Sequence, residues 1–184
     1  MDLDKQGNKK KIGILGGTFD PAHKGHLSIS KEAKKRYEID KIIWAVTKKN
    51  PFKKKPSLSL NKRISLCKKI AKYNKKIKVE SYDDKIKSSQ SINLINHLKK
   101  NKKNVEYFFL IGSDNLISLH KWKNWRELSK ICRITVLSRR GYVKKSLKSK
   151  AFVTLGYSNL LLLKSKMYNI SSSKIRKNYL KYKN

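Results

Sequence analysis

The sequence predicts an α/β fold of one domain: an open, doubly wound, mainly parallel sheet with helices on both faces. Two observations lead to this prediction. Short runs of Ile, Val, Leu and aromatic residues alternate with longer segments of helical spacing along the 184 residues. Glycines and other turn-forming residues follow several of these runs directly, as at the ends of parallel strands. The length suits a single hydrophobic core.

Each expected element rests on its own apolar pattern. Strands are expected where a short apolar run is bounded by polar or turn residues, at residues 11–15, 41–46, 76–79, 105–111, 131–137 and 159–163. Helices are expected where apolar residues recur every three or four positions, at residues 26–37, 60–73, 91–100, 115–120, 125–130 and 171–183. Residues 138–149 are expected to form a basic loop or a short helix. This order of elements indicates a Rossmann-like domain over residues 11–184, preceded by a polar tail at residues 1–10.

The formal net charge of +35 is extreme, and such a field attracts nucleic acids, anionic membranes and phosphorylated small molecules. The lysines are spread through nearly every segment, which is more typical of a solvated surface or a bias in composition than of a dedicated nucleic-acid surface. No specific nucleic-acid partner is therefore expected. No apolar run is long enough to span a membrane, and no signal peptide is recognisable. Cys67 and Cys132 lack metal-ligand spacing and are expected to be reduced thiols of a cytoplasmic protein.

The most informative stretch is GGTFDPAHKGHL, residues 16–27, which follows the first expected strand. Glycines at this place let the backbone approach a phosphate, and the next helix offers free N–H groups. The stretch matches neither the GxGxxG fingerprint nor the GxxxxGK(S/T) phosphate-binding loop. His23 and His26 could be metal ligands, but no nearby residues complete a metal site. Beside a glycine turn, hydrogen bonding to phosphate oxygens is the better interpretation, and no protein-held metal is expected.

Ligands of doubly wound folds bind beyond the carboxyl ends of the strands. Four polar or glycine-containing segments directly follow expected strands, and we expect them to share one mouth. These segments are residues 16–26, 47–55, 112–115 and 138–140.

Two motifs resemble the signatures of a known superfamily. The sequence His23-Lys24-Gly25-His26 resembles the T/HxGH motif of nucleotidyltransferases. Residues 170–176, ISSSKIR, resemble their second signature, ISSTxxR, with Ser173 in the place of threonine. Residues 112–122, GSDNLISLHKW, and 138–142, SRRGY, are similar to segments of the bacterial nicotinate-nucleotide adenylyltransferases. The chain departs from that family at Ser89 and Gln90, where a Tyr-Thr pair is usual.

The resemblance implies adenylyl transfer from ATP to nicotinate mononucleotide, with Mg²⁺ accompanying ATP, and leaves the oligomeric state open, a homo-oligomer included. It implies that the catalytic residues are His23 and His26. It implies that ATP is bound by Gly16, Gly17, Thr18, Phe19, Gly112, Asp114, Ser171, Ser172 and Arg176. It implies that the mononucleotide is bound by Trp122, Ser89, Gln90, Lys53 and Arg139. Asp20 is expected to hydrogen-bond the backbone and fix its loop.

Three alternatives remain open. Another adenylyltransferase of the superfamily, acting on phosphopantetheine, would share both phosphate motifs. The amidated mononucleotide could replace the acid, because nothing in the sequence fixes that choice. A basic nucleic-acid-binding module would explain the charge, although no recognised nucleic-acid motif accompanies it.

Overall fold

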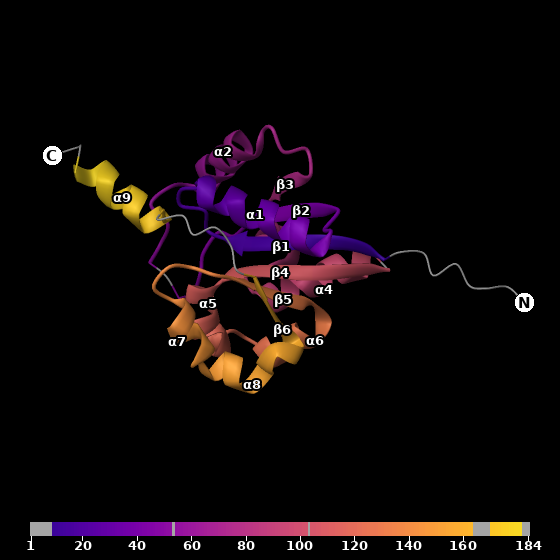
Figure 1. The fold of residues 1–184 in the computed structure, drawn as a ribbon. Helices are drawn as coiled ribbons and strands as arrows, with labels where there is room; N and C mark the ends of the chain where they lie inside the picture. Colours follow the sequence, from indigo (N-terminus) through magenta and orange to yellow (C-terminus); the bar gives the residue numbers. More distant parts are fainter. Residues whose placement is uncertain (1–8, 53, 103, 164–169, 182–184) are drawn as a thin grey trace, which may run out of the picture.

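A computed structural model describes residues 9–52, 54–102, 104–163 and 170–181 of the chain. Six strands form one sheet in the order β3-β2-β1-β4-β5-β6, and all of its pairings are parallel (Figure 1). The strands are β1 (Lys10–Gly17), β2 (Lys41–Val46), β3 (Ile77–Glu80), β4 (Val105–Gly112), β5 (Arg133–Leu137) and β6 (Leu160–Leu163). The predicted doubly wound fold is confirmed.

Helices cover both faces of this sheet. On one face lie α1 (Lys24–Tyr37) and α2 (Leu60–Ala71). The other face carries α4 (Ser91–Asn101), α5 (Ser113–Ser118), α6 (Trp125–Ile131) and α8 (Lys150–Asn159). Short connections contain α3 (Asp83–Ile86), the 3₁₀ turn η1 (Leu119–Lys121) and α7 (Val143–Leu147). The last helix, α9 (Ser172–Lys181), projects from the sheet and begins beside its carboxyl edge (Figure 1).

Each strand divides its side chains between two cores, because successive residues of a strand point to opposite faces. In β2, Ile42 and Trp44 pack with α1 and α2, whereas Ile43 and Ala45 pack with α4. Both sets are buried, so the strands read as continuous apolar runs rather than as alternating patterns. This is why continuous apolar runs mark the inner strands, whereas the edge strand β3, with the sequence IKVE, alternates and is only partly buried.

Four parts of the element prediction differ from the structure. The first strand, expected at residues 11–15 with a turn after it, continues to Gly17. The strand expected at residues 131–137 begins only at Arg133, because α6 continues to Ile131. Helix α3 was not predicted, and its four residues are too few to show a period. Helix α8 was not predicted either. Its buried side is narrow, and Gly156, with φ of +59°, interrupts it.

The order of strands places a topological switch point between β1 and β4. The chain leaves β1 toward β2 on one side, while β4 pairs with β1 on the other side. Connections therefore diverge at the carboxyl ends of these two strands and leave a crevice there. The glycine turn, residues 16–20, lies at this crevice: it comprises the last two residues of β1 and the start of the loop into α1.

Two features outside the crevice bear on the sequence predictions. Cys67 and Cys132 are buried free thiols, and burial raises the pKa of each to about 12. Among the described helices, none is both long and apolar enough to cross a bilayer.

Candidate active site

Two adjoining cavities open at the carboxyl edge of the sheet. The histidine cavity, about 430 Å³, is lined by the glycine turn, both histidines and the segments after β4 and β5. The tryptophan cavity, about 300 Å³, is lined by Trp122, Gln90 and the loop after β2. Gly16 and Gly17 line both cavities. The segments predicted to share one mouth thus lie at one edge but are divided between two cavities that meet at the glycine turn.

His23 and His26 are held in place by the start of helix α1. His23 is the N-cap, and its Nδ1 accepts a hydrogen bond from the Gly25 N–H at 3.1 Å. The His23 N–H donates to Nδ1 of His26, also at 3.1 Å. Because Nδ1 accepts in both rings, each neutral imidazole carries its proton on Nε2. The ring centroids are 3.9 Å apart, and both rings line the histidine cavity.

Burial is the main influence on the charge of His23. Together with the positive charge of Arg139, it lowers the pKa of His23 from 6.5 to about 4. His23 is therefore an uncharged hydrogen-bond donor at neutral pH, and it does not serve as a general acid there.

Gly25 is required by the position of the His23 ring. A Cβ atom at Gly25 would lie 2.8 Å from Nδ1 and 2.9 Å from Cε1 of that ring. Both distances are below those that real Cβ contacts show, so any side chain would displace the imidazole. The glycine of the His-x-Gly-His motif thus allows a helix start to be capped by its own histidine.

Two aromatic side chains pack against the ring of His26. The rings of Phe19, His26 and Trp44 contact one another: Phe19 lies 4.8 Å from His26 and 5.3 Å from Trp44, and His26 lies 6.1 Å from Trp44, between ring centroids. Trp44 is fully buried, and its indole N–H donates to Ser30 Oγ at 2.8 Å. Ser30 Oγ in turn donates to the His26 carbonyl oxygen at 3.0 Å. Phe19 lines the histidine cavity with Thr18, but it is 2% exposed, so its main contacts are within the core.

Asp114 and Arg139 form an ion pair on the wall of the histidine cavity. Asp114 follows β4, and Arg139 follows β5, so the pairing of the two strands brings them together. A Cβ atom at Gly112 would lie 2.4 Å from Asp114 Oδ1, so glycine leaves room for the carboxylate. Arg139, predicted to bind the mononucleotide, lies in the histidine cavity and does not line the tryptophan cavity.

The start of α9 closes the histidine cavity from the other end of the chain. Ser171 and Ser172 line it. Ser171 Oγ accepts the Lys174 N–H at 3.2 Å, and Ser172 Oγ donates to the Pro21 carbonyl oxygen at 2.9 Å. Arg176 donates to the Asp20 carbonyl oxygen and, at 3.4 Å, to Asp20 Oδ2. The Arg176 guanidinium is thereby engaged by the glycine turn and does not line the cavity.

Asp20 fixes its loop through the backbone. Its carboxylate accepts the N–H groups of Ser57 and Leu58 at 2.8 and 3.0 Å, and its side chain is buried. These bonds attach the loop after β1 to the loop that leads into α2.

Arg63, a buried residue that the sequence prediction missed, connects the loops of both cavities. Its guanidinium donates to the carbonyl oxygens of Thr18 at 2.6 Å and Thr47 at 2.8 Å, and further to those of Leu58 and Lys48. Burial lowers its pKa, and the nearby charge of Asp20 is the largest opposing influence. In the sequence Arg63 lies among the lysines of an amphipathic helix, so no pattern distinguished it from the solvated face.

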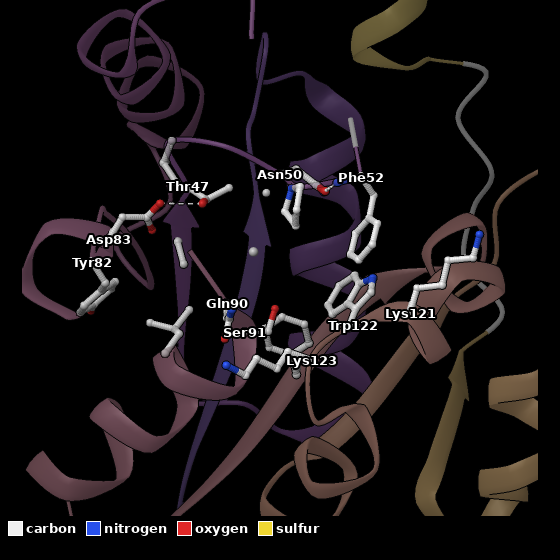
Figure 2. Close-up of a pocket in the computed structure, with 17 residues that line it drawn as sticks. Thr47, Asn50, Phe52, Tyr82, Asp83, Gln90, Ser91, Lys121, Trp122 and Lys123 are labelled. Atoms are coloured by element: carbon white, nitrogen blue, oxygen red, sulfur yellow. Dashed lines mark hydrogen bonds between the residues drawn. The ribbon is translucent and has the colours of Figure 1, made fainter. Parts of the chain in front are cut away.

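The tryptophan cavity is bounded by an aromatic pair and a polar wall. Trp122 and Phe52 point toward one another, while Thr47 and Asp83 lie across from them (Figure 2). The Asp83 carboxylate accepts the Thr47 hydroxyl at 2.7 Å and the Lys48 N–H at 2.8 Å. Phe52 lines the cavity and is 48% exposed. Its place in the site was not predicted, because its loop is otherwise lysine-rich.

Of the other residues predicted to bind the mononucleotide, one lines the tryptophan cavity, one does not, and the third is not described by the structure. Gln90 lines the tryptophan cavity, and its neighbour Ser91 does so in place of Ser89, which is exposed. Ser89 precedes the first turn of α4, so it lies away from the cavity wall. Lys53 lies outside the described residues.

The carboxylates in and beside the two cavities are already partnered by protein groups. Across residues 9–52, 54–102, 104–163 and 170–181, no three His, Cys, Asp or Glu side chains gather to hold a metal ion. Asp20 is bound by two N–H groups and Arg176, and Asp114 by Arg139. The two imidazoles, Arg139 and the start of α9 instead suit a polyanion with several oxygen acceptors.

Comparison with known proteins agrees with this geometry. The family described as cytidylyltransferase-like matches residues 14–178. A protein of Pelagibacter ubique named "Probable nicotinate-nucleotide adenylyltransferase" is 52% identical over 169 residues, 92% of this chain and 93% of that protein. One of the same name from Aliarcobacter butzleri is 40% identical over 146 residues, 79% of each chain.

Solved structures share the fold. A Plasmodium falciparum nicotinic acid mononucleotide adenylyltransferase complexed with NaAD superposes with a TM-score of 0.70 at 19% identity, covering 91% of this chain and 83% of that one. From the family match and the identities with its relatives, we conclude that the chain belongs to the cytidylyltransferase-like family and, within it, to the nicotinate-nucleotide adenylyltransferases.

Proposed function

We propose that this enzyme transfers the adenylyl group of ATP to nicotinate mononucleotide, giving nicotinate adenine dinucleotide and pyrophosphate. The observation that carries the proposal is the meeting of two cavities at Gly16 and Gly17. One cavity is rich in phosphate-binding groups, and the other has an aromatic wall suited to a flat ring. A reaction that joins two nucleotides through their phosphates needs both, with the reacting phosphates at the junction.

In the proposed reaction, an oxygen of the mononucleotide phosphate attacks the α-phosphorus of ATP. A new P–O bond forms, the bond to the bridging oxygen between the α- and β-phosphorus breaks, and its electron pair leaves with pyrophosphate. The attacking oxygen is already anionic, so no protein base is required. Catalysis then rests on positioning and on stabilising charge in the transition state.

His23 and His26 are the proposed catalytic residues. Their Nε2–H groups would donate to oxygens of the α-phosphate, and two donors on one turn of α1 suit two oxygens of one phosphorus. The lowered pKa of His23 supports a role as neutral donor. Gly16 and Gly17 would let the phosphates approach the backbone without steric obstruction.

The other ATP contacts follow the walls of the histidine cavity. Ser171 and Ser172, at the start of α9, would bind the β- and γ-phosphates through hydroxyls and backbone N–H groups. Asp114 would hold the adenosine ribose or adenine, and Arg139 would neutralise phosphate charge. Arg176 would act by holding the glycine turn in place, because its guanidinium is engaged by Asp20.

Mg²⁺ fits this cavity as an ion that arrives with ATP. Both nearby carboxylates, Asp20 and Asp114, are partnered by protein donors, which favours coordination by phosphate oxygens and water. When bound, the ion would neutralise phosphate charge.

Pyrophosphate release tests the proposal directly. Purified enzyme with ATP and Mg²⁺ is supplied with nicotinate mononucleotide, nicotinamide mononucleotide or phosphopantetheine in parallel. We expect clear release with the nicotinate form and loss of about 100-fold or more in kcat in H23Q, as for other displaced transition-state donors. Pyrophosphate release only with phosphopantetheine would overturn the assignment of the substrate. If no substrate gives release and the protein binds oligonucleotides in a salt-sensitive way, the nucleic-acid-binding alternative is favoured.

A further inference from the structure

We propose that Lys123 selects the acid over the amide form of the pyridine mononucleotide by pairing with the carboxylate on the ring. This inference rests on the proposed function and names a residue that neither sequence motif contains. The two candidate substrates differ only in one ring substituent, a carboxylate or a carboxamide. They have nearly the same shape, so the feature that separates them is a negative charge.

Lys123 is placed to sense that charge. It directly follows Trp122, the proposed stacking residue, and lines the same cavity. Figure 2 shows its side chain extending toward Gln90 and Ser91, across the space beside the Trp122 ring. Within the described part of the chain, Lys123 forms no ion pair. Its ammonium group is therefore available to a substrate anion.

The start of helix α4 adds to the positive potential at this end of the cavity. Gln90 is the N-cap of α4 but forms no capping hydrogen bond with its side chain, and the first turn contains no acidic residue. N–H groups at the first turn therefore lack a side-chain acceptor, and the positive end of the helix dipole faces Lys123. A carboxylate between them would be attracted by both.

Gln90 itself does not decide the choice. Its Oε1 atom is buried without a hydrogen-bond partner. Its carboxamide offers both an acceptor and a donor, so it can bond either an amide or a carboxylate. The negative charge is the difference between the two substituents that the Gln90 carboxamide does not discriminate, and Lys123 supplies a charge of the opposite sign.

The negative charge of the cavity lies at the opposite wall. Asp83 accepts the Thr47 hydroxyl and the Lys48 N–H, and Figure 2 shows it beside Thr47 and away from Lys123. A substrate carboxylate would be repelled from Asp83 and attracted to Lys123. The charges thus fix which edge of a pyridine ring stacked on Trp122 carries the substituent.

The experiment compares kcat/KM for the nicotinate and nicotinamide mononucleotides in the wild type and in K123Q. We expect the acid-to-amide ratio to fall about ten-fold, equivalent to about 1.4 kcal/mol. The change should lie in KM for the acid, with the amide little affected. K123R should keep most of the preference. K130Q is the matched control: it removes the same charge from a nearby exposed lysine that does not line the cavity, and should keep the wild-type ratio.

The outcomes separate this inference from the proposed function. If the wild type turns over neither mononucleotide, the proposed function itself fails. If the wild type prefers the acid and K123Q keeps that preference, or loses both activities equally, Lys123 does not select and the inference is wrong. An equal fall in the ratio for K130Q would show a bulk charge effect and would also overturn the inference.

Discussion

The chemistry of the site depends on how single residues are buried and bonded. His23 combines three properties. As the helix cap its Nδ1 accepts a hydrogen bond, which leaves the proton on Nε2, and burial together with the charge of Arg139 lowers its pKa to about 4. A histidine in water would be partly cationic near neutral pH. Desolvation keeps this ring neutral, so it can donate to phosphate without a charge that changes across the physiological range.

The pH dependence of stability should report this burial. Because the folded pKa of His23 lies below the unfolded value of 6.5, the unfolded chain binds a proton between about pH 4 and 6.5 that the folded chain does not. The free energy of unfolding therefore falls as pH decreases through this window and is unaffected by His23 above it. Urea unfolding at pH 7 and pH 5 should show a larger decrease for the wild type than for H23Q. Equal decreases would contradict the burial of this ring.

Gly25 offers a second test at the scale of one residue. A methyl group in G25A would press on the His23 ring and displace it from its cap position. We expect kcat to fall about 100-fold, because small misplacements of catalytic groups have effects of this size. The thermal midpoint should change much less than the activity. Near-normal kcat in a folded G25A protein would show that the position of the His23 ring does not matter.

At the scale of elements, the site is built from loops that leave parallel strands and are tied to one another. Arg63 joins the loop after β1 to the loop after β2 through four carbonyl oxygens. The Thr47 N–H also donates to the Gly17 carbonyl oxygen at 2.9 Å. These hydrogen bonds join the loops that form the boundary of the two cavities. Movement of one loop should therefore change the shape of both cavities.

Removal of the Arg63 guanidinium should damage both cavities together. In R63M the side chain still fills space, but four carbonyl oxygens lose their donor, at a cost of at least about 3 kcal/mol in the free energy of unfolding. KM should rise for both ATP and the mononucleotide, and R63K should be affected less. Urea unfolding and substrate titrations give these values. A rise in only one KM would refute the shared boundary.

At the scale of the whole molecule, the net charge of +35 should act on encounter rather than on chemistry. Lysines distributed over the surface create a long-range positive field, which raises the capture rate of anionic nucleotides and is screened by salt. The fold itself does not require this charge, because both cores are apolar.

Kinetics at different ionic strengths test this effect. We expect kcat/KM for ATP to fall about ten-fold between about 0.05 and 0.5 M salt, because screening shortens the reach of the field. The value of kcat at saturation serves as control, since capture does not limit it, and should change little. A kcat/KM independent of salt would mean that the lysines do not steer substrate.

The sequence by itself determined the fold class and the position of the glycine turn. Buried parallel strands are apolar on both faces, so each appears as a continuous run, and chain order with the preference for right-handed crossovers then restricts the topology. His23 and His26 could be singled out because they are close in sequence to that turn. Their catalytic role stays a prediction.

Only the tertiary structure decided which distant side chains meet. Ser172 donates to Pro21 across 151 residues, and Arg63 reaches Thr18 across 45. The division into two cavities, and the meeting of Lys123 with Gln90 in one of them, likewise depend on the order in which the strands pair. Sequence patterns record local periodicity, whereas these contacts arise from long-range packing, which a single chain's residue spacing does not encode.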